Sequence, residues 1–488
     1  MTVLAASPLW FTALPPLQDY AYHLAQVEIL EADAAAFPAF ERDLGFRPYA
    51  AFYALTSALS GVLPVETAGR LVVTLYFVLL AGVLAAWAVE ARRPLWPGLA
   101  LLPFAAIQPT YVLGFLNYQL AMPFLLGGLW VWPRFARRPS VATASVLAAC
   151  IVGLFTTHPF SYLVFLGFAG LRLVWEADLR ARVAGWGAWT LATAIFAAWF
   201  LAADGGQGAS GPEGVQWLGV AESLRILALP FLGMHADRID PVVATLWWVW
   251  FTGLAWLWWR APERVSDEAR YFALACAIAT LATLVFPFRM GHYSYINARM
   301  PGVAMLCLAM AIAPLRVPRP WAAAHVLLLC AALGVAVAQQ RRVGEAMDEV
   351  LPLLEQVPRD AALLPLVFDP YSDELDPRLF APFLHIHHAV HVLQGGGVTP
   401  YFFPHPLAPV RYAEGQPPLA PPQYRPGRFE LARHAGYDHW LLRSPPPRAW
   451  SALSRSGTEI ARSGDWVLLR REPSAAPAEQ SPTPPSGS

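Results

Sequence analysis

The chain has 488 residues, of which 56% are hydrophobic and 14% are charged. Soluble domains carry about 25% charged residues, so this composition excludes an ordinary soluble protein and indicates one embedded in a membrane. The formal net charge is zero, which gives no reason to expect nucleic acid as a partner.

The amino-terminal segment is apolar over residues 3–14, which is shorter than the about 20 residues that cross a bilayer. We expect it to be the end of a first transmembrane helix whose beginning is missing from this start site. Residues 15–64 follow as a mixed polar stretch, and we predict that they form the first exterior loop. Within that loop, residues 48–63 are moderately apolar and predict an interfacial or re-entrant helix.

Long apolar runs then continue as far as residue 339. They lie at about 70–89, 95–113, 118–133, 141–157, 160–175, 184–203, 241–259, 271–288, 300–315 and 320–339. By length and hydropathy, these runs predict an all-α polytopic membrane domain over residues 1–339, with about 10–11 transmembrane helices.

Arginines divide the connections between these runs into two kinds. Every second connection is rich in arginine, namely those with Arg92 and Arg93, Arg134, Arg137 and Arg138, Arg180 and Arg182, Arg260, Arg264 and Arg270, and Arg316 and Arg319. The positive-inside rule assigns these connections to the cytoplasm. The other connections then face outward, and all the polar residues that we single out below lie in them. We therefore predict a multi-pass protein of the inner (plasma) membrane.

The composition changes near residue 340, where an amphipathic helix begins. We predict that residues 340–472 form a small exterior (periplasmic) α/β domain and that the Pro/Ser/Ala-rich residues 473–488 are disordered. The elements expected in this domain are strands at 362–368, 439–442 and 466–470, a helix at 380–393 and a long irregular loop at 400–428.

Asp19 and His23 stand out in the first exterior loop because they are four residues apart and share a face if the segment is helical. A carboxylate beside the membrane surface can act as a general base or as a cation ligand, provided that burial raises its pKa. The alternative is that Asp19 only solvates or caps the helix that follows it.

Two shorter polar motifs lie at the same outer level. Asn117 belongs to the turn Gly114–Tyr118 and can hydrogen-bond a sugar or a phosphate; alternatively, the turn is only a tight helical hairpin. His158 lies at the start of a later apolar run. It is either a catalytic or ligand-binding residue or only a hydrogen-bonded residue at the membrane interface.

The densest outer cluster contains Arg289, His292 and Arg299, together with Tyr293, Tyr295 and Asn297. Two arginines in an outer connection call for an explanation, because the positive-inside rule makes outer connections poor in arginine. The planar guanidinium group suits the phosphate of an anionic lipid. The alternative is a belt of Arg and Tyr that anchors the chain among lipid headgroups.

With these motifs in place, the chain resembles bacterial membrane glycosyltransferases of the GT-C type. The similar stretches are Leu17–Ala25, which carries Asp19, the turn Gly114–Tyr118, and the carboxy-terminal segments Tyr437–Leu442 and Ser463–Leu468. The plan of many spans followed by an exterior α/β domain also matches. Two features depart from the pattern: the loop has a single Asp where many relatives carry an acidic pair, and the first helix is short.

The resemblance implies transfer of a sugar from a polyprenyl-phosphate donor to an acceptor on the exterior face. Asp19 would be the base or the contact of a divalent metal cation, with His23 and His158 supporting it as catalytic residues. Arg289 and Arg299 would hold the donor phosphate. Asn117 and His292 would be further substrate contacts, and lipid-linked sugar and membrane lipids would be the partners. Two alternatives remain, a transporter or flippase for lipid-linked saccharides and a non-enzymatic protein of envelope assembly.

Overall fold

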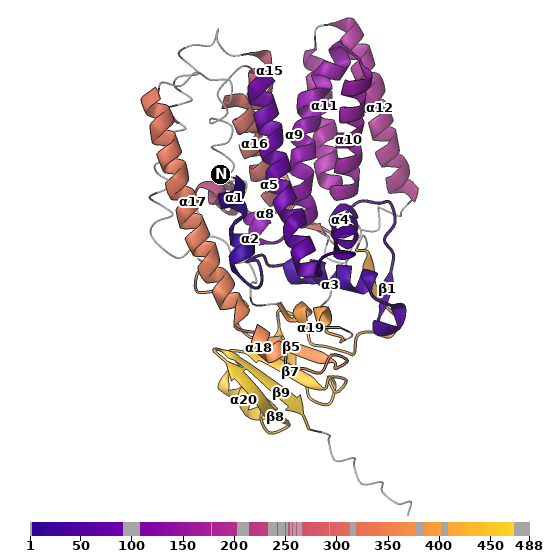
Figure 1. Cartoon of the computed structure of the whole chain (residues 1–488), viewed down its shortest axis with the longest axis vertical. Coiled ribbons are helices and arrows are strands. Elements are labelled where there is room, and N and C mark those ends of the chain that lie inside the picture. The colour runs from indigo at the N-terminus through magenta and orange to yellow at the C-terminus, as the bar shows by residue number, and fades with distance from the viewer. Residues whose placement is uncertain are drawn as a thin grey trace, which may run out of the picture.

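The computed structural model shows a bundle of helices with a small sheet region at its carboxy-terminal end (Figure 1). It describes residues 2–90, 108–176, 178–202, 214–232, 266–291, 293–312, 319–375, 385, 387–395, 397–401 and 408–472, and six single positions between 242 and 260. The predicted runs at 95–113 and 241–259 and the predicted tail at 473–488 fall largely or wholly outside the described residues.

The amino-terminal segment is folded against the bundle in two short helices, α1 (Thr2–Ala6) and α2 (Pro8–Phe11). The segment is helical on both sides of Ser7, and the expectation that it is the end of a first transmembrane helix stays a prediction. The chain is next held by Asp348, whose two carboxylate oxygens accept from the backbone N–H groups of Ala13 and Leu14 at 2.9 and 3.0 Å. This contact fixes where the first loop starts.

The first loop contains two helices, α3 (Tyr20–Glu31) and α4 (Ala51–Ser60). The second agrees with the short helix predicted at 48–63. The loop also contains the strand β1 (Phe40–Arg42), which pairs antiparallel with β6 (Val410–Tyr412) from near the other end of the chain. The loop is thus bonded directly to the sheet region.

The main bundle is built from apolar helices around α9 (Leu116–Arg137), which packs against α5, α10, α11 and α12. The other helices are α5 (Val65–Glu90), α8 (Pro109–Val112), α10 (Val141–Thr157), α11 (Pro159–Trp175), α12 (Leu179–Ala202), α13 (Val220–Leu232), α15 (Asp267–Val285), α16 (Met300–Ile312) and α17 (Arg319–Asp348). Local sequence sets several helix starts: Ser140 forms a capping box with Thr143, and Ser266 caps α15 through the N–H of Ala269.

Four helices in the described part of the chain are long and apolar enough to cross a membrane. They are α5, α12, α15 and the stretch Val326–Leu354, which takes in most of α17. Helices α10 and α11 are apolar but shorter, with 17 residues each. These helices carry large exposed apolar side chains such as Leu191 and Leu201 on α12, as expected where lipid rather than water surrounds a helix.

The arginine-rich ends of the helices meet at one end of the bundle. Arg134, near the end of α9, donates from Nε to Glu90 Oε1 of α5 at 2.7 Å. Arg137 pairs with Glu176 after α11 at 2.9 Å and lies 3.5 Å from Glu268 at the start of α15. The arginine-rich connections that these helices carry are therefore gathered together, at the end of α9 opposite to Asn117.

The carboxy-terminal sheet region (residues 351–472) has a four-stranded sheet in the order β5-β7-β9-β8. Strands β5 (Leu363–Val367) and β7 (His439–Arg443) are parallel, and the other pairs are antiparallel. The helices α18 (Leu351–Leu354), α19 (Val390–Leu393) and α20 (Pro447–Leu453) accompany the sheet. The strands β5, β7 and β9 (Trp466–Arg471) confirm the three predicted strands.

Two expectations for this region need correction. The fourth strand, β8 (Gly457–Ser463), was not predicted, because it is an edge strand whose side chains are mostly exposed and polar. The predicted start of a new domain at residue 340 lies inside α17, which is continuous from Arg319 to Asp348. Of the helix predicted at 380–393, the described residues contain only α19 and the 3₁₀ turn His387–Ala389 before it.

Replacing Asp348 by Ala should release the amino-terminal segment, because two backbone N–H groups lose their acceptor. We expect a loss of about 1–3 kcal/mol of stability, measured as a lower thermal unfolding midpoint of the detergent-solubilised protein. Arg341→Ala is the matched control: it removes an exposed pair with Glu345 on the same helix and should change stability by less than about 1 kcal/mol. Equal midpoints for the two variants would contradict this role of Asp348.

Candidate functional site

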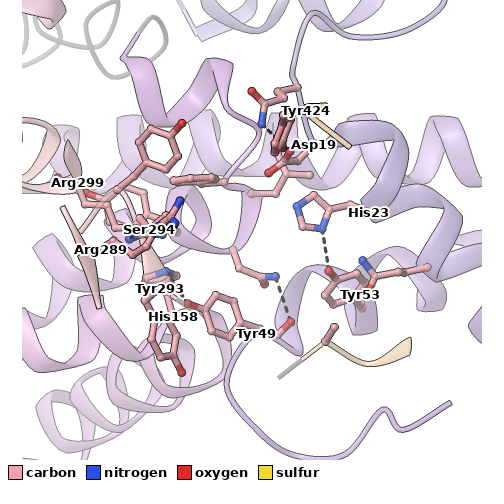
Figure 2. Close-up of a pocket in the computed structure, with 18 residues that line it drawn as sticks. Asp19, His23, Tyr49, Tyr53, His158, Arg289, Tyr293, Ser294, Arg299 and Tyr424 are labelled. Atoms are coloured by element: carbon pink, nitrogen blue, oxygen red, sulfur yellow. Dashed lines mark hydrogen bonds between the residues drawn. The ribbon is translucent and has the colours of Figure 1, made fainter. Parts of the chain in front are cut away.

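A cavity of about 350 Å³ lies where the starts of α3, α9, α11 and α16 meet the sheet region (Figure 2). It is lined by Gln18, Asp19, His23, Gln26, Tyr49, Tyr53, Phe115, Leu116, Asn117, Tyr118, His158, Arg289, Tyr293, Ser294, Tyr295, Arg299, Ala408 and Tyr424. Six of the seven site residues that the sequence suggested therefore line a single cavity. The seventh, His292, lies outside the described residues.

Asp19 is buried at the start of α3, with 6% of its surface exposed. Its Oδ1 accepts a hydrogen bond from the Gln18 side-chain amide at 3.1 Å. Burial raises the pKa of the carboxyl from 3.8 to about 7, and the bond from Gln18 lowers it in part. The side chain makes no capping hydrogen bond to α3, so helix capping does not account for this residue.

The turn before α9 presses against Asp19 and fixes its position. The N–H of Gln18 donates to the carbonyl of Val112 at 2.8 Å. Gly114 has a φ of +75°, and a Cβ at this glycine would lie 2.7 Å from the Asp19 backbone nitrogen. Both the conformation and the close approach require glycine. The two motifs that the sequence marked separately are thus one packed unit.

His23 is held by hydrogen bonds at both ring nitrogens. Its Nε2 lies 3.1 Å from the carbonyl of Gly114, and its Nδ1 lies 2.8 Å from the Tyr53 hydroxyl. Since a carbonyl can only accept, Nε2 carries the proton and Nδ1 accepts from Tyr53. Burial lowers the pKa of His23 to about 4, against a smaller opposing effect of the Gly114 carbonyl. The ring is therefore neutral at pH 7, and its two hydrogen bonds connect α3 to α4 and to the Gly114 turn.

Asn117 and His158 both hold the segment that carries Tyr49. Asn117 accepts from the N–H of Phe52 at 3.0 Å and donates to the carbonyl of Tyr49 at 3.1 Å. His158 caps α11 by accepting from the N–H of Ser161 at 3.4 Å, and its Nε2 lies 3.1 Å from the Tyr49 hydroxyl. Asn117 and His158 are therefore positioning residues, which hold Tyr49 in the lining of the cavity.

Arg299 is the buried cation of the cavity, with 8% of its surface exposed. Its Nη1 donates to the carbonyl of Ser294 at 2.8 Å, and its guanidinium lies 4.8 Å from the centre of the Phe115 ring. The Tyr118 hydroxyl donates to the Arg299 carbonyl at 2.5 Å. The Nε atom is buried and has no hydrogen-bond partner among the described residues. An arginine held by rings and one carbonyl retains capacity to bind an anion.

Arg289 and Arg299 both hydrogen-bond Ser294, which brings the two arginines close together. Its Nε donates to the Ser294 hydroxyl at 3.1 Å, while Arg299 bonds the carbonyl of the same serine. Arg289 begins β3 (Arg289–Met290), which pairs with β4 (Tyr293–Ser294) and with β2 (Val215–Gln216). The short three-stranded sheet therefore carries Arg289 and Ser294, and Ser294 links this sheet to Arg299 in the 3₁₀ turn Asn297–Arg299.

Reasoning on the sequence missed the lining residues Tyr49 and Tyr424, and it placed Tyr295 in the outer cluster without assigning it a role. Tyr49 and Tyr295 adopt positive φ values of 65° and 59°, which are uncommon for residues other than glycine and often occur at functional sites. Tyr424 arrives from the distant carboxy-terminal segment and stands beside Asp19 (Figure 2). The abundance of tyrosine in the outer connections is a signal for Tyr49 and Tyr295. Nothing in the sequence pattern predicts that Tyr424 joins them.

The predicted divalent cation can be tested against the side chains present. In the described residues no three His, Cys, Asp or Glu side chains come together in a way that could hold a metal ion. Among the described residues that line the cavity, Asp19 is the only carboxylate. Magnesium keeps several water ligands and is commonly held by one or two carboxylates together with substrate phosphates, so Asp19 would be its one carboxylate ligand here. The predicted cation stays a prediction, and we derive no step through it.

Comparison of the chain with models of known protein families and with curated proteins gives no match. The function must therefore be argued from the geometry of the cavity.

Replacing Gly114 by Ala should displace Asp19, because the added methyl group meets its backbone and the φ of +75° disfavours alanine. We expect a loss of about 1–3 kcal/mol in stability by thermal unfolding. Gly82→Ala is the control, since nothing lies within 4 Å of a Cβ there and α5 should gain about 1 kcal/mol from better helix propensity. A Gly114→Ala protein as stable as wild type would contradict the packed unit.

The raised pKa of Asp19 predicts a pH-dependent cost. From about pH 4 to about pH 7 the folded chain keeps this proton while the unfolded chain releases it, so stability falls as pH rises through this window. Above about pH 7 the cost is complete, and Asp19→Asn removes it. We expect the Asn variant to be more stable than wild type there by about 2–4 kcal/mol, at about 1.4 kcal/mol per pH unit. Unfolding midpoints measured from about pH 5 to about pH 8 test this. Parallel curves for the two proteins would show that Asp19 is not buried as described.

Proposed function

We propose that this chain is a polytopic membrane glycosyltransferase that moves a sugar from a polyprenyl-phosphate donor to the hydroxyl of an acceptor. One observation carries the proposal: a single cavity contains a buried carboxyl with a pKa of about 7 and a buried arginine whose Nε has no hydrogen-bond partner in the described part of the chain. Transfer from a glycosyl phosphate needs both an activated hydroxyl and a neutralised leaving phosphate.

Asp19 is assigned the role of general base. A base works best when its pKa lies near the working pH, and burial brings Asp19 there. In the proposed step the acceptor oxygen bonds to the anomeric carbon of the donor sugar, and the bond from that carbon to the phosphate oxygen breaks. Asp19 takes the proton of the acceptor hydroxyl. The electron pair of the broken bond leaves with the lipid phosphate.

Arg299 and Arg289 are assigned to the donor phosphate. Both guanidinium groups line the cavity and are linked through Ser294, so they can meet one phosphate from the same side. Arg299 is shielded by Phe115, and charge interactions in a water-poor site are stronger than in bulk solvent. The leaving phosphate gains negative charge in the transition state, which is where a fixed guanidinium contributes most.

The tyrosines of the cavity are assigned to the sugar ring. Tyr49, Tyr53, Tyr293 and Tyr424 offer aromatic faces and hydroxyl groups around the space between the carboxyl and the arginines (Figure 2). Tyr295 also lines this cavity. Aromatic faces with a few polar groups suit a ring that has both apolar and hydroxyl-bearing surfaces. His23, Asn117 and His158 are positioning residues, because they hold Tyr53 and Tyr49 in place by hydrogen bonds.

We further propose that the cavity faces the exterior of the inner membrane and that the protein has the predicted 10–11 transmembrane helices. Supporting this, the arginine-rich ends are joined by ion pairs at the end of α9 away from Asn117 and the cavity. The positive-inside rule assigns that end to the cytoplasm. The cavity and the sheet region would then both be periplasmic, and the donor lipid would lie along the apolar helices.

Transfer should depend on Asp19 and Arg299 in different ways. In liposomes supplied with a polyprenyl-phosphate sugar and an acceptor, we expect Asp19→Asn to lower kcat by about 10²–10⁴-fold. Arg299→Gln should weaken both donor binding and turnover, by about 10–100-fold in kcat/KM. The wild-type kcat/KM should rise with pH through about 7, because the base must be ionised, and this rise should vanish in the Asn variant.

The controls are Glu345→Gln and Arg341→Gln, which alter an exposed carboxylate and an exposed arginine of α17 that do not line the cavity. Both should retain wild-type rates. Full activity of Asp19→Asn and of Arg299→Gln would sink the transferase mechanism. Movement of the lipid-linked sugar across the bilayer without transfer would favour the flippase instead, although a transporter site is expected near the membrane midplane rather than at helix ends.

A further inference from the structure

A second cavity, of about 240 Å³, lies within the sheet region beside the first. Its lining comes from the end of β5, the loop that follows it, the turn at His388 and the segment 401–426. The lining residues are Pro365, Val367, Phe368, Pro370, Tyr371, His388, Tyr401, Gln423, Tyr424 and Pro426. Tyr424 lines both cavities, so one side chain forms the partition between them.

The helix that carries Asp19 is bonded to the wall of this second cavity. Tyr22 follows Asp19 by three residues, and its hydroxyl lies 2.5 Å from His388 Nε2. The Gln423 side-chain amide donates to the same hydroxyl at 3.5 Å. His388 and Gln423 both line the second cavity, so α3 connects the carboxyl of the first cavity with the wall of the second.

The two cavities are also close in space at a second point. Burial raises the pKa of the Tyr295 hydroxyl, and the charges of Asp19 and Tyr371 raise it further. Tyr295 lines the first cavity and Tyr371 lines the second. An electrostatic effect of one on the other requires that they lie near each other. The linings of the two cavities therefore lie near each other at Tyr295, Tyr371 and Tyr424.

The lining of the second cavity differs from the first in charge. Its lining includes no Asp, Glu or Arg among the residues that the structure describes, whereas the first cavity holds Asp19, Arg289 and Arg299. The second cavity instead offers rings (Phe368, Tyr371, Tyr401 and Tyr424), proline faces, one amide and one imidazole. Such a surface has no attraction for a phosphate. It suits a neutral ring that carries hydroxyl groups.

We propose that the second cavity is a saccharide-binding subsite, and that it holds a neutral sugar of the acceptor while the acceptor's reacting hydroxyl reaches Asp19 past Tyr424. The assignment to the acceptor rests on the proposed function, whereas the binding of a saccharide does not. The donor is excluded because its phosphate needs the arginines and its lipid must stay beside the apolar helices. The subsite is lined by residues of the sheet region, which Figure 1 shows beyond one end of the helix bundle.

The test measures saccharide binding without turnover. The full chain in nanodiscs, carrying Asp19→Asn, is titrated with methyl glycosides of hexoses and pentoses, and binding is followed by saturation-transfer NMR and calorimetry. We expect saturable binding of at least one glycoside. Adding Tyr371→Ala should weaken its Kd about tenfold, because one ring face is lost, while Tyr371→Phe should keep Kd within about twofold. Gln423→Ala provides a second variant if Tyr371→Ala does not fold.

Leu419→Ala is the matched control, an exposed apolar side chain of the same segment that lines neither cavity, and its Kd should equal that of the parent. In the transfer assay, Tyr371→Ala should raise KM for the acceptor and leave KM for the donor unchanged. The subsite is overturned if no glycoside binds the parent, or if Tyr371→Ala and Gln423→Ala both bind as the parent does. If binding depends on Tyr371 but wild type transfers no sugar, the subsite stands and the proposed function falls.

Discussion

The burial of the Asp19 carboxyl beside a single amide is the constraint around which the cavity is built. A carboxylate withdrawn from water without a cationic partner is costly, and among the described residues the Gln18 amide is the one side-chain hydrogen-bond donor to Asp19. The chain holds this unfavourable arrangement by packing the Gly114 turn against the Asp19 backbone and by tying the start of α3 to Val112. Such a cost persists only where the surrounding structure dictates the position, and it leaves a proton acceptor tuned near neutral pH.

Polar residues around the cavity divide into those that build it and those that remain chemically available. His23, Asn117 and His158 use their polar atoms on the backbone or on tyrosine hydroxyls, so their value lies in fixing loops from three helices. Asp19 and Arg299 can still hydrogen-bond a ligand in the cavity. One carboxylate oxygen of Asp19 is bonded to Gln18, and the Arg299 Nε has no partner in the described residues. Hydrogen-bond accounting therefore separates positioning residues from reactive ones, which residue type alone does not.

The sequence was informative about features that depend only on the order of residues along the chain. Hydropathy and arginine spacing depend only on position along the chain, and they grouped Asp19, Asn117, His158, Arg289 and Arg299 on one side before any coordinates were known. Buried strands such as β7 were predictable because a continuous apolar run leaves little choice. The pairing of β1 with β6, the partition by Tyr424 and the break between α1 and α2 depend on contacts between distant residues, and no local pattern encodes them.

Arg299 shows how the topology rule and the chemistry of the cavity fit together. The positive-inside rule concerns charges that must cross or face the membrane surface, whereas Arg299 is buried among rings. Its presence in a connection predicted to face outward therefore does not weaken the predicted topology. It raises a different question, since a buried guanidinium that pairs with no carboxylate among the described residues costs free energy that an ordinary anchor at the headgroups would not. An anion in the cavity would offset that cost. The proposed function therefore assigns the donor phosphate to the same arginine that departs from the simple charge pattern.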